Sequence, residues 1–220
     1  CIAAVLTILI SKKYIAIEGM NWGEYYTLLL FAVSGMMVLV SATDLVTIYL
    51  GMEFMALTVY VLTGYLRHDT RSNEAALKYF LLGAFSSAII LYGMVLLYGV
   101  TGSTNIYKVA SFLAANDNFS NPVMIASVIL LVAGFAFKVA AVPFHMWAPD
   151  AYEGAPTSIT AFMAVGPKAA SFAVILRIFL IALPSMKSHW IPIFWGISAI
   201  SMLLGNIVAV AQTNIKRMLA

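Results

Sequence analysis

Five ionisable residues lie inside long apolar stretches of this sequence, where a charge is costly. They are Glu53, Lys78, Lys138, Lys168 and Arg177. A charge at the centre of a bilayer costs at least ~2.5–3.5 kcal/mol, so such residues usually pair with one another or line a polar path. A carboxylate can accept a proton, and a buried lysine can release one. Their presence in one apolar chain therefore indicates proton movement across a membrane.

The depth of these residues follows from a helical rise of about 1.5 Å per residue. Measured from the nearest polar boundary, Glu53 lies roughly 14 Å and Lys168 roughly 18 Å into a ~30 Å hydrocarbon core. Lys78 lies only roughly 7 Å in, and Arg177 can reach the interface with its long side chain. One carboxylate then faces three lysines, and the unmatched cations favour a lysine that gives up its proton. A static pair of Glu53 with one lysine, which only fixes helix packing, is the alternative.

The helix that carries Lys138 is expected to be broken. The stretch 122–155 has 34 residues, roughly 50 Å as one helix and too long for the hydrocarbon core. Pro143 lies within it, so we expect a break near Pro143 and a second helical piece over 144–153. An ionisable residue beside a broken helix is typical of transporter sites at membrane depth.

Two further residues, Pro167 and His145, lie close in sequence to the intramembrane lysines or to the expected helix break. Pro167 precedes Lys168 and removes the backbone hydrogen bond to the Met163 carbonyl, so a second helix break with a free acceptor is expected there. His145 follows the first break, where its imidazole can either cap the broken helix or take part in a proton relay. Both roles of His145 stay open.

The composition places these residues in an integral membrane protein. The 220 residues are 63% hydrophobic and 10% charged, with a mean hydropathy of +0.97, whereas soluble domains are about 25% charged. The apolar runs are about 20 residues long, which indicates an all-α polytopic protein rather than a barrel. The net charge is +3, but the basic residues form no continuous run along the sequence. No nucleic-acid partner is therefore expected.

The small numbers of cysteines and histidines argue against a bound redox cofactor or metal. Cys1 is the single cysteine, and the three histidines are His68, His145 and His189. Iron–sulfur clusters need several cysteines, and a haem held by two histidines needs both at matching depth. The sequence has no glycine-rich nucleotide motif of the GxGxxG or GxxxxGK[ST] type. We therefore expect no cofactor and no metal in this chain.

Seven membrane spans follow from the apolar runs. Their predicted bounds are 1–10, 24–42, 44–65, 74–100, 122–142, 156–182 and 190–211. The loops on one side are 11–23, 66–73, 143–155 and 212–220, and they carry six Lys and Arg. The loops on the other side, including a long polar loop over 102–122, carry two. This bias predicts that the first set of loops is cytoplasmic.

Several segments together resemble the antiporter-like membrane subunits of respiratory complex I. They are DLVTIYLGMEFMALTVYVLTGY (44–65), GFAFKVAAVPFHMWAPDAYEGAPTSITAFMAVGPKAASFAVILRIF (134–179) and the closing NIKRMLA (214–220). Two segments, 72–105 and 166–179, are most similar to the N-type branch of that family in bacteria. The resemblance covers nearly the whole chain.

The resemblance implies an antiporter-like fold built from two inverted five-helix repeats, each with a broken helix. The chain 1–220 would then be a fragment, with the first repeat over 24–182 and the start of the second over 183–220. The relay positions of the family fall on Glu53 and on three lysines: Lys78, Lys138 and Lys168. The resemblance implies that Glu53 pairs with Lys138.

The function implied by the resemblance is that of a non-redox, proton-translocating subunit of NADH:quinone oxidoreductase in the bacterial inner membrane. NADH, flavin, iron–sulfur clusters and quinone would belong to partner subunits, and the other membrane-arm subunits and the lipid bilayer would be its partners. A subunit of a multisubunit cation/proton antiporter or of a membrane-bound hydrogenase is an alternative. A passive membrane scaffold is another.

Overall fold

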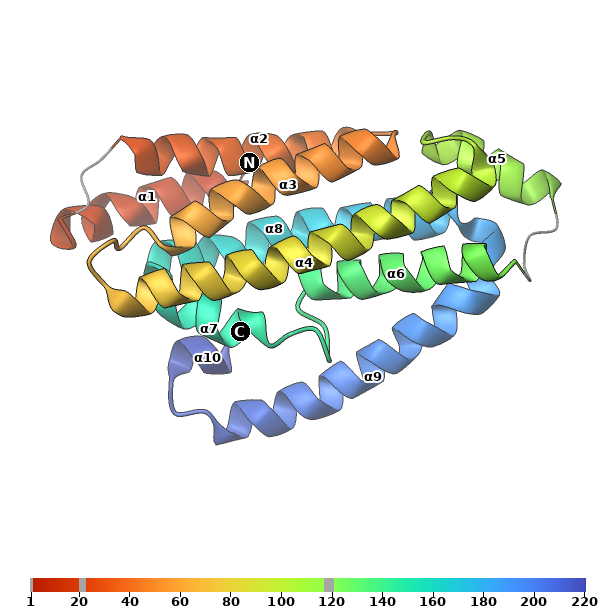
Figure 1. Ribbon diagram of the computed structural model, residues 1–220. Coiled ribbons are helices and arrows are strands. Elements are labelled where there is room, and N and C mark those ends of the chain that lie inside the picture. Colours follow the sequence, from red (N-terminus) through yellow and green to blue (C-terminus); the bar gives the residue numbers. More distant parts are fainter. Residues whose placement is uncertain (1, 20–22, 117–120) are drawn as a thin grey trace.

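The computed structural model describes residues 2–19, 23–116 and 121–220, and these form a bundle of helices (Figure 1). The bounds are α1 Ile2–Ile17, α2 Glu24–Ser41, α3 Leu45–Thr63, α4 Thr70–Thr101, α5 Ile106–Ala115, α6 Pro122–Lys138, α7 Trp147–Gly154, α8 Thr157–Arg177, α9 Lys187–Ala211 and α10 Ile215–Met218. A π-helical turn (Ile178–Ala182) extends α8, and a 3₁₀ turn (Pro184–Met186) precedes α9.

Five of these helical stretches are long and apolar enough to cross a membrane. They are 24–41, 45–63, 70–101, 157–182 and 184–211. They correspond to five of the seven predicted spans, so an all-α polytopic fold is confirmed. Many large apolar side chains on these helices are exposed, including Leu50, Phe85 and Val210. Such a surface suits contact with lipid or with another membrane helix.

The predicted boundaries are wrong where a short helix lies inside an expected loop. Helix α1 continues to Ile17, α4 begins at Thr70, and the expected loop 212–220 contains α10. The second helical piece expected over 144–153 is present as α7. The long polar loop expected over 102–122 contains α5. Its Ile106, Val109 and Leu113 repeat at helical spacing and are buried, which is an amphipathic pattern that the polar flanking residues mask.

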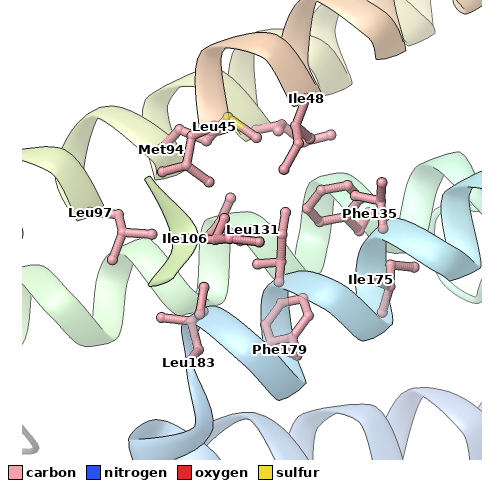
Figure 2. Packing of buried hydrophobic residues seen from close by; sticks show 14 of the residues in the cluster. Leu45, Ile48, Met94, Leu97, Ile106, Leu131, Phe135, Ile175, Phe179 and Leu183 are labelled. Atoms are coloured by element: carbon pink, nitrogen blue, oxygen red, sulfur yellow. The ribbon is translucent and has the colours of Figure 1, made fainter. Parts of the chain in front are cut away.

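The buried apolar residues form two clusters. One is built mainly by α2, α3, α7 and α8, and the other is the apolar centre where α3, α4, α5, α6 and α8 meet. Figure 2 shows side chains from these helices converging there, among them Ile48, Leu131 and Phe179. The Leu45 N–H donates to the Thr104 carbonyl over 2.8 Å and the Ile106 N–H donates to the Thr43 carbonyl over 3.0 Å. These bonds join the start of α3 to the start of α5 and fix the end of the bundle that holds the apolar centre.

Two helices lie at the margin of the bundle. Helix α9 runs obliquely along one side, and α10 folds back toward α7 (Figure 1). Trp190 is the one buried residue within α9, so most of this long apolar helix has no cover from the described residues.

Candidate functional site

Glu53 is positioned by the close contact of α2 and α3. Gly35 and Gly51 face each other at this contact, and a Cβ at either position would come within 2.6–2.7 Å of the opposite backbone. Small residues of this kind let membrane helices approach closely. Asp44 caps the start of α3 by accepting from the Val46 N–H over 2.9 Å, which fixes where the helix begins. Glu53 then lies on α3 half a turn beyond Gly51.

Lys138 is the last residue of α6, and the helix ends there by a Schellman motif. The Ala141 N–H donates to the Ala136 carbonyl over 2.8 Å, and the Ala140 N–H donates to the Phe137 carbonyl over 3.0 Å. This pairing requires a left-handed residue after the helix, and Ala140 supplies it with φ 58°. Lys138 is thus a basic residue in the last turn of α6, where the negative end of the helix dipole stabilises a cation.

The helix is broken near Pro143, as expected, but Pro143 is not the residue that ends α6. The α-helix ends at Lys138, five residues before Pro143, and the second piece begins at Trp147 rather than at 144. The Schellman motif stops the helix first, so Pro143 lies in the turns that follow. The Val142 N–H in this segment donates to the Ser201 hydroxyl of α9 over 3.0 Å.

Helix α4 is held against α6 by serine hydroxyls and glycines. The Ser86 hydroxyl donates to the Gly134 carbonyl over 3.2 Å, and the Ser127 hydroxyl donates to the Gly93 carbonyl over 2.7 Å. Both acceptors are glycines, whose missing side chains let the two helices approach. This contact brings Ser87 of α4 beside the end of α6.

The three elements meet in a buried triad made of Glu53, Ser87 and Lys138. Lys138 Nζ donates to Ser87 Oγ over 3.1 Å, and the Ser87 hydroxyl donates to Glu53 Oε1. The direct distance from Lys138 Nζ to Glu53 Oε1 is 3.8 Å. The side chains of Lys138 and Glu53 are 7% and 23% exposed. Ser87 was not among the predicted site residues, and the signal for it was a serine pair, Ser86-Ser87, within a long apolar helix.

Lys78 lies elsewhere and has carboxylate partners of its own. Its Nζ lies 2.8 Å from Glu74 Oε1 and 3.0 Å from Asp150 Oδ2, and its side chain is 47% exposed. The expectation that Glu53 alone faces three lysines is therefore wrong. The chain folds back so that Asp150 of α7 reaches the first turns of α4, which sequence spacing does not reveal.

Lys78 belongs to a charged cluster around a cavity of about 310 Å³. The charged members of this cluster are Arg71, Glu74, Lys78, Asp150, Glu153 and Arg217. Arg217 of α10 donates to Asp150 over 2.8 Å and to Glu153 over 2.6 Å. Burial raises the pKa of Asp150, but Lys78 and Arg217 together outweigh burial and hold that pKa below its usual value. The cluster joins α4, α7 and α10.

Lys168 lies apart from the buried triad. Within the described residues it has no ion pair, and its ammonium group lies 5.4 Å from the centre of the Tyr152 ring. An aromatic face at this distance stabilises a cation. The expectation that Pro167 breaks this helix is wrong, because α8 continues through Pro167 from Thr157 to Arg177. One missing backbone hydrogen bond is tolerated where neighbouring helices hold both halves in line.

Buried polar atoms without partners lie near the break. Among the described residues they include His145 Nδ1 and the hydroxyl groups of Tyr60 and Tyr152. Helix α7 has no side-chain cap, so His145 does not cap it. A buried polar group that lacks a hydrogen bond is costly, so these atoms mark positions suited to water or a proton.

Trp147 anchors the second helical piece to the first. Its indole N–H donates to the Phe137 carbonyl over 2.9 Å, and its ring stacks on Tyr79 with centroids 4.3 Å apart. Phe137 also packs against the indole ring, with centroids 5.5 Å apart. Within the described residues, no group of His, Cys, Asp and Glu side chains is arranged to hold a metal.

Comparison with known proteins identifies the family. Residues 42–220 match the family model described as NADH:quinone oxidoreductase/Mrp antiporter, transmembrane region. The chain belongs to this family. The match includes every member of the buried triad and of the charged cluster, and it confirms the resemblance found in the sequence.

Curated relatives within the family resemble the chain along its full length. It is 51% identical over 219 residues to NADH-quinone oxidoreductase subunit N of Trichlorobacter lovleyi, covering 100% of this chain and 45% of that protein. It is 54% identical over 219 residues to subunit N 2 of Rhizobium meliloti, with the same coverage. These identities support the N-type branch. The chain thus spans a little under half the length of the relatives it matches.

Solved structures agree with this assignment. A chain of respiratory complex I from Thermus thermophilus with bound aureothin superposes with a TM-score of 0.77 at 35% identity, covering 99% of this chain and 46% of that one. A chain of an archaeal membrane-bound sulfane sulfur reductase superposes with a TM-score of 0.86 at 27% identity, covering 99% of this chain and 44% of that one. A chain of the Mrp complex of Dietzia shares the fold, with a TM-score of 0.84 at 23% identity. The superposition covers 98% of this chain and 40% of that one.

Proposed function

We propose that this chain is part of a non-redox, proton-translocating subunit in the membrane arm of an NADH:quinone oxidoreductase. The observation that carries the proposal is the buried triad. It places a carboxylate, a hydroxyl and a primary amine in hydrogen-bond sequence at the end of a broken membrane helix. Groups of this kind at membrane depth mark proton paths. The relatives named subunit N support the same assignment.

In this proposal the described residues form the first half of a longer relay. Residues 24–182 are the first five-helix repeat, and 183–220 begin the second. Glu53 and Lys138 exchange a proton, and Lys168 passes it toward the second repeat. Lys78 lies in the charged cluster at the cytoplasmic entrance. His145, with a buried and unpartnered Nδ1 beside the break, is a further relay candidate.

The partners of such a subunit are the other membrane-arm subunits and the lipid bilayer of the bacterial inner membrane. NADH, flavin, iron–sulfur clusters and quinone belong to partner subunits, and the free energy of quinone reduction drives the protons. The loops around 11–23, 66–73, 143–155 and 212–220 face the cytoplasm, since they carry most of the basic residues outside the spans.

The test uses the full-length subunit in the assembled complex in inverted membrane vesicles. Glu53→Gln and Lys138→Met should each reduce proton pumping at least about tenfold relative to wild type, since a positioned acid or base contributes ~10²–10⁴-fold to proton transfer. Lys12→Met, at an exposed position of α1, is the matched control. Normal pumping by both triad variants would overturn the proposal. Pumping that requires sodium would favour a cation/proton antiporter instead.

A further inference from the structure

Ser87 occupies the space between the two charged members of the buried triad. Lys138 Nζ and Glu53 Oε1 are 3.8 Å apart, beyond the 2.7–3.2 Å of an ordinary N–H···O hydrogen bond. The path through the hydroxyl consists of two hydrogen bonds, one of 3.1 Å from Lys138 to Ser87 and one from Ser87 to Glu53. Ser87 is 3% exposed. The hydrogen-bonded route for a proton between the two charges therefore passes through Ser87 Oγ.

The direction of these bonds is fixed by chemistry. An ammonium group can only donate, and an ionised carboxylate can only accept. The Ser87 proton therefore points at Glu53, and a lone pair of Ser87 Oγ accepts the hydrogen bond from Lys138. This is the arrangement from which two protons can shift together.

The bonding of Ser87 differs from that of most hydroxyl groups in this bundle. Ser11, Ser41 and Thr63 each donate to the carbonyl four residues earlier in their own helix, which is the usual local bond of a helical hydroxyl. The adjacent Ser86 donates to the Gly134 backbone across the helix contact. Ser87 instead bonds two ionisable side chains from two other helices.

We propose that Ser87 is a relay residue that carries the proton between Lys138 and Glu53. In the step, an N–H bond of Lys138 breaks as its proton bonds to Ser87 Oγ, while the original hydroxyl proton leaves Ser87 and bonds to Glu53 Oε1. The products are a neutral amine, an unchanged serine and a neutral carboxylic acid. Both charges disappear together, so no lone charge is left in the low-dielectric interior. The hydroxyl then donates to the amine, which holds the pair ready for the reverse step.

This inference rests on the proposed function, and its test separates the two. Ser87→Ala and Ser87→Cys are introduced into the full-length subunit of the assembled complex. Cysteine keeps nearly the volume of serine but is a weak hydrogen-bond donor, so it carries the test if the alanine variant fails to assemble. Thr101→Val is the matched control, because Thr101 is a buried hydroxyl residue of the same helix that donates only to backbone carbonyls, those of Leu97 and Ser103. Proton pumping is measured with quinone reductase activity, and infrared difference spectra record the carboxylic acid band that Glu53→Gln removes.

We expect both Ser87 variants to pump at least about tenfold more slowly than wild type and to lose most of the Glu53 acid band. Thr101→Val should keep both. If Ser87→Ala and Ser87→Cys pump like Thr101→Val while Glu53→Gln and Lys138→Met do not pump, the relay role of Ser87 is wrong and the proposed function stands. If Glu53→Gln and Lys138→Met also pump normally, the proposed function itself is wrong.

Discussion

Gly35 of α2 and Gly51 of α3 form a reciprocal contact in which each leaves room for the backbone of the other helix. A Cβ on Gly51 would lie 2.7 Å from the Leu39 nitrogen, and a Cβ on Gly35 would lie 2.6 Å from the Met55 nitrogen. Backbone cannot move aside as a flexible side chain can. The contact therefore determines how far α3, with Glu53, lies from α2.

Replacing Gly51 with alanine should push α2 and α3 apart and displace Glu53 from Ser87. We expect Gly51→Ala to reduce proton pumping by more than about tenfold in assembled complex, because small misplacement of a reacting group costs ~10²-fold. Gly99→Ala is the control, since nothing lies within 4 Å of a Cβ at that position. Equal pumping by the two variants would show that this helix contact does not position Glu53.

The charge of Glu53 matters more than its length if the pair is functional. Glu53→Ala leaves Lys138 without its carboxylate, and truncating one member of a buried pair typically costs roughly 3–5 kcal/mol. Glu53→Asp keeps the charge one methylene further away. We expect Glu53→Ala to lose pumping and Glu53→Asp to retain a measurable part of it. Near-native pumping by both variants would support a purely structural pair.

Lys168 should be needed as a proton carrier and not only as a fixed charge. Arginine keeps the positive charge but does not deprotonate at any working pH, whereas lysine does. Lys168→Arg should therefore assemble and still fail to pump, as Lys168→Met should. Pumping and quinone reductase activity are measured side by side in membranes. Normal pumping by Lys168→Arg would mean that only fixed charge is required at this position.

The charged cluster should release α10 in acid. Lys78 and Arg217 hold the pKa of Asp150 below its usual value of 3.8. A lowered folded-state pKa stabilises the fold at pH values above 3.8, and this contribution is lost as the pH falls through the lowered pKa. Spin labels at Leu219 and Leu77, both exposed, should therefore move apart in the most acidic samples, with Cys1 replaced by serine.

Asp150→Asn is the matched variant for this effect. It should loosen α10 already at neutral pH, by less than about 1 kcal/mol because the pairs are partly exposed. It should also abolish most of the acid-dependent change in the label distance. An acid response of normal size in Asp150→Asn would place the titrating group elsewhere.

Ala140 should be a site where glycine stabilises the protein. Its φ of 58° lies in the left-handed region, which costs a residue with a side chain roughly 1–2 kcal/mol. Ala140→Gly should raise the midpoint of thermal unfolding in detergent, and Ala140→Val should lower it. Ala199→Gly, in the middle of α9, should lower the midpoint, since glycine in a helix interior adds backbone freedom to the unfolded chain without relieving any strain. A lower midpoint for Ala140→Gly would mean that the left-handed conformation at Ala140 is not a source of strain in the folded protein.

The sequence by itself determined the class of the protein and most of its chemistry. Apolar runs of membrane length predicted the five long helices, and the cost of an intramembrane charge singled out Glu53, Lys138 and Lys168. A resemblance across the chain predicted the family. These inferences depend on local composition and short-range pattern, which are present in the sequence without any knowledge of the fold.

The tertiary structure alone decided which of these groups meet. Ser87 lies 34 residues from Glu53 and 51 from Lys138, and the close packing of α4 on α3 at Gly83 and on α6 at Gly134 brings the three together. Likewise, Lys78 donates a hydrogen bond to Asp150, which lies 72 residues further along the chain. The two meet because the chain turns back after the broken helix. A Schellman motif at Ala140, rather than Pro143, ended α6, since a helix stops at the first residue whose backbone leaves the helical region. Contacts between distant segments depend on helix crossing and on side-chain direction, and neither is encoded in spacing along the chain.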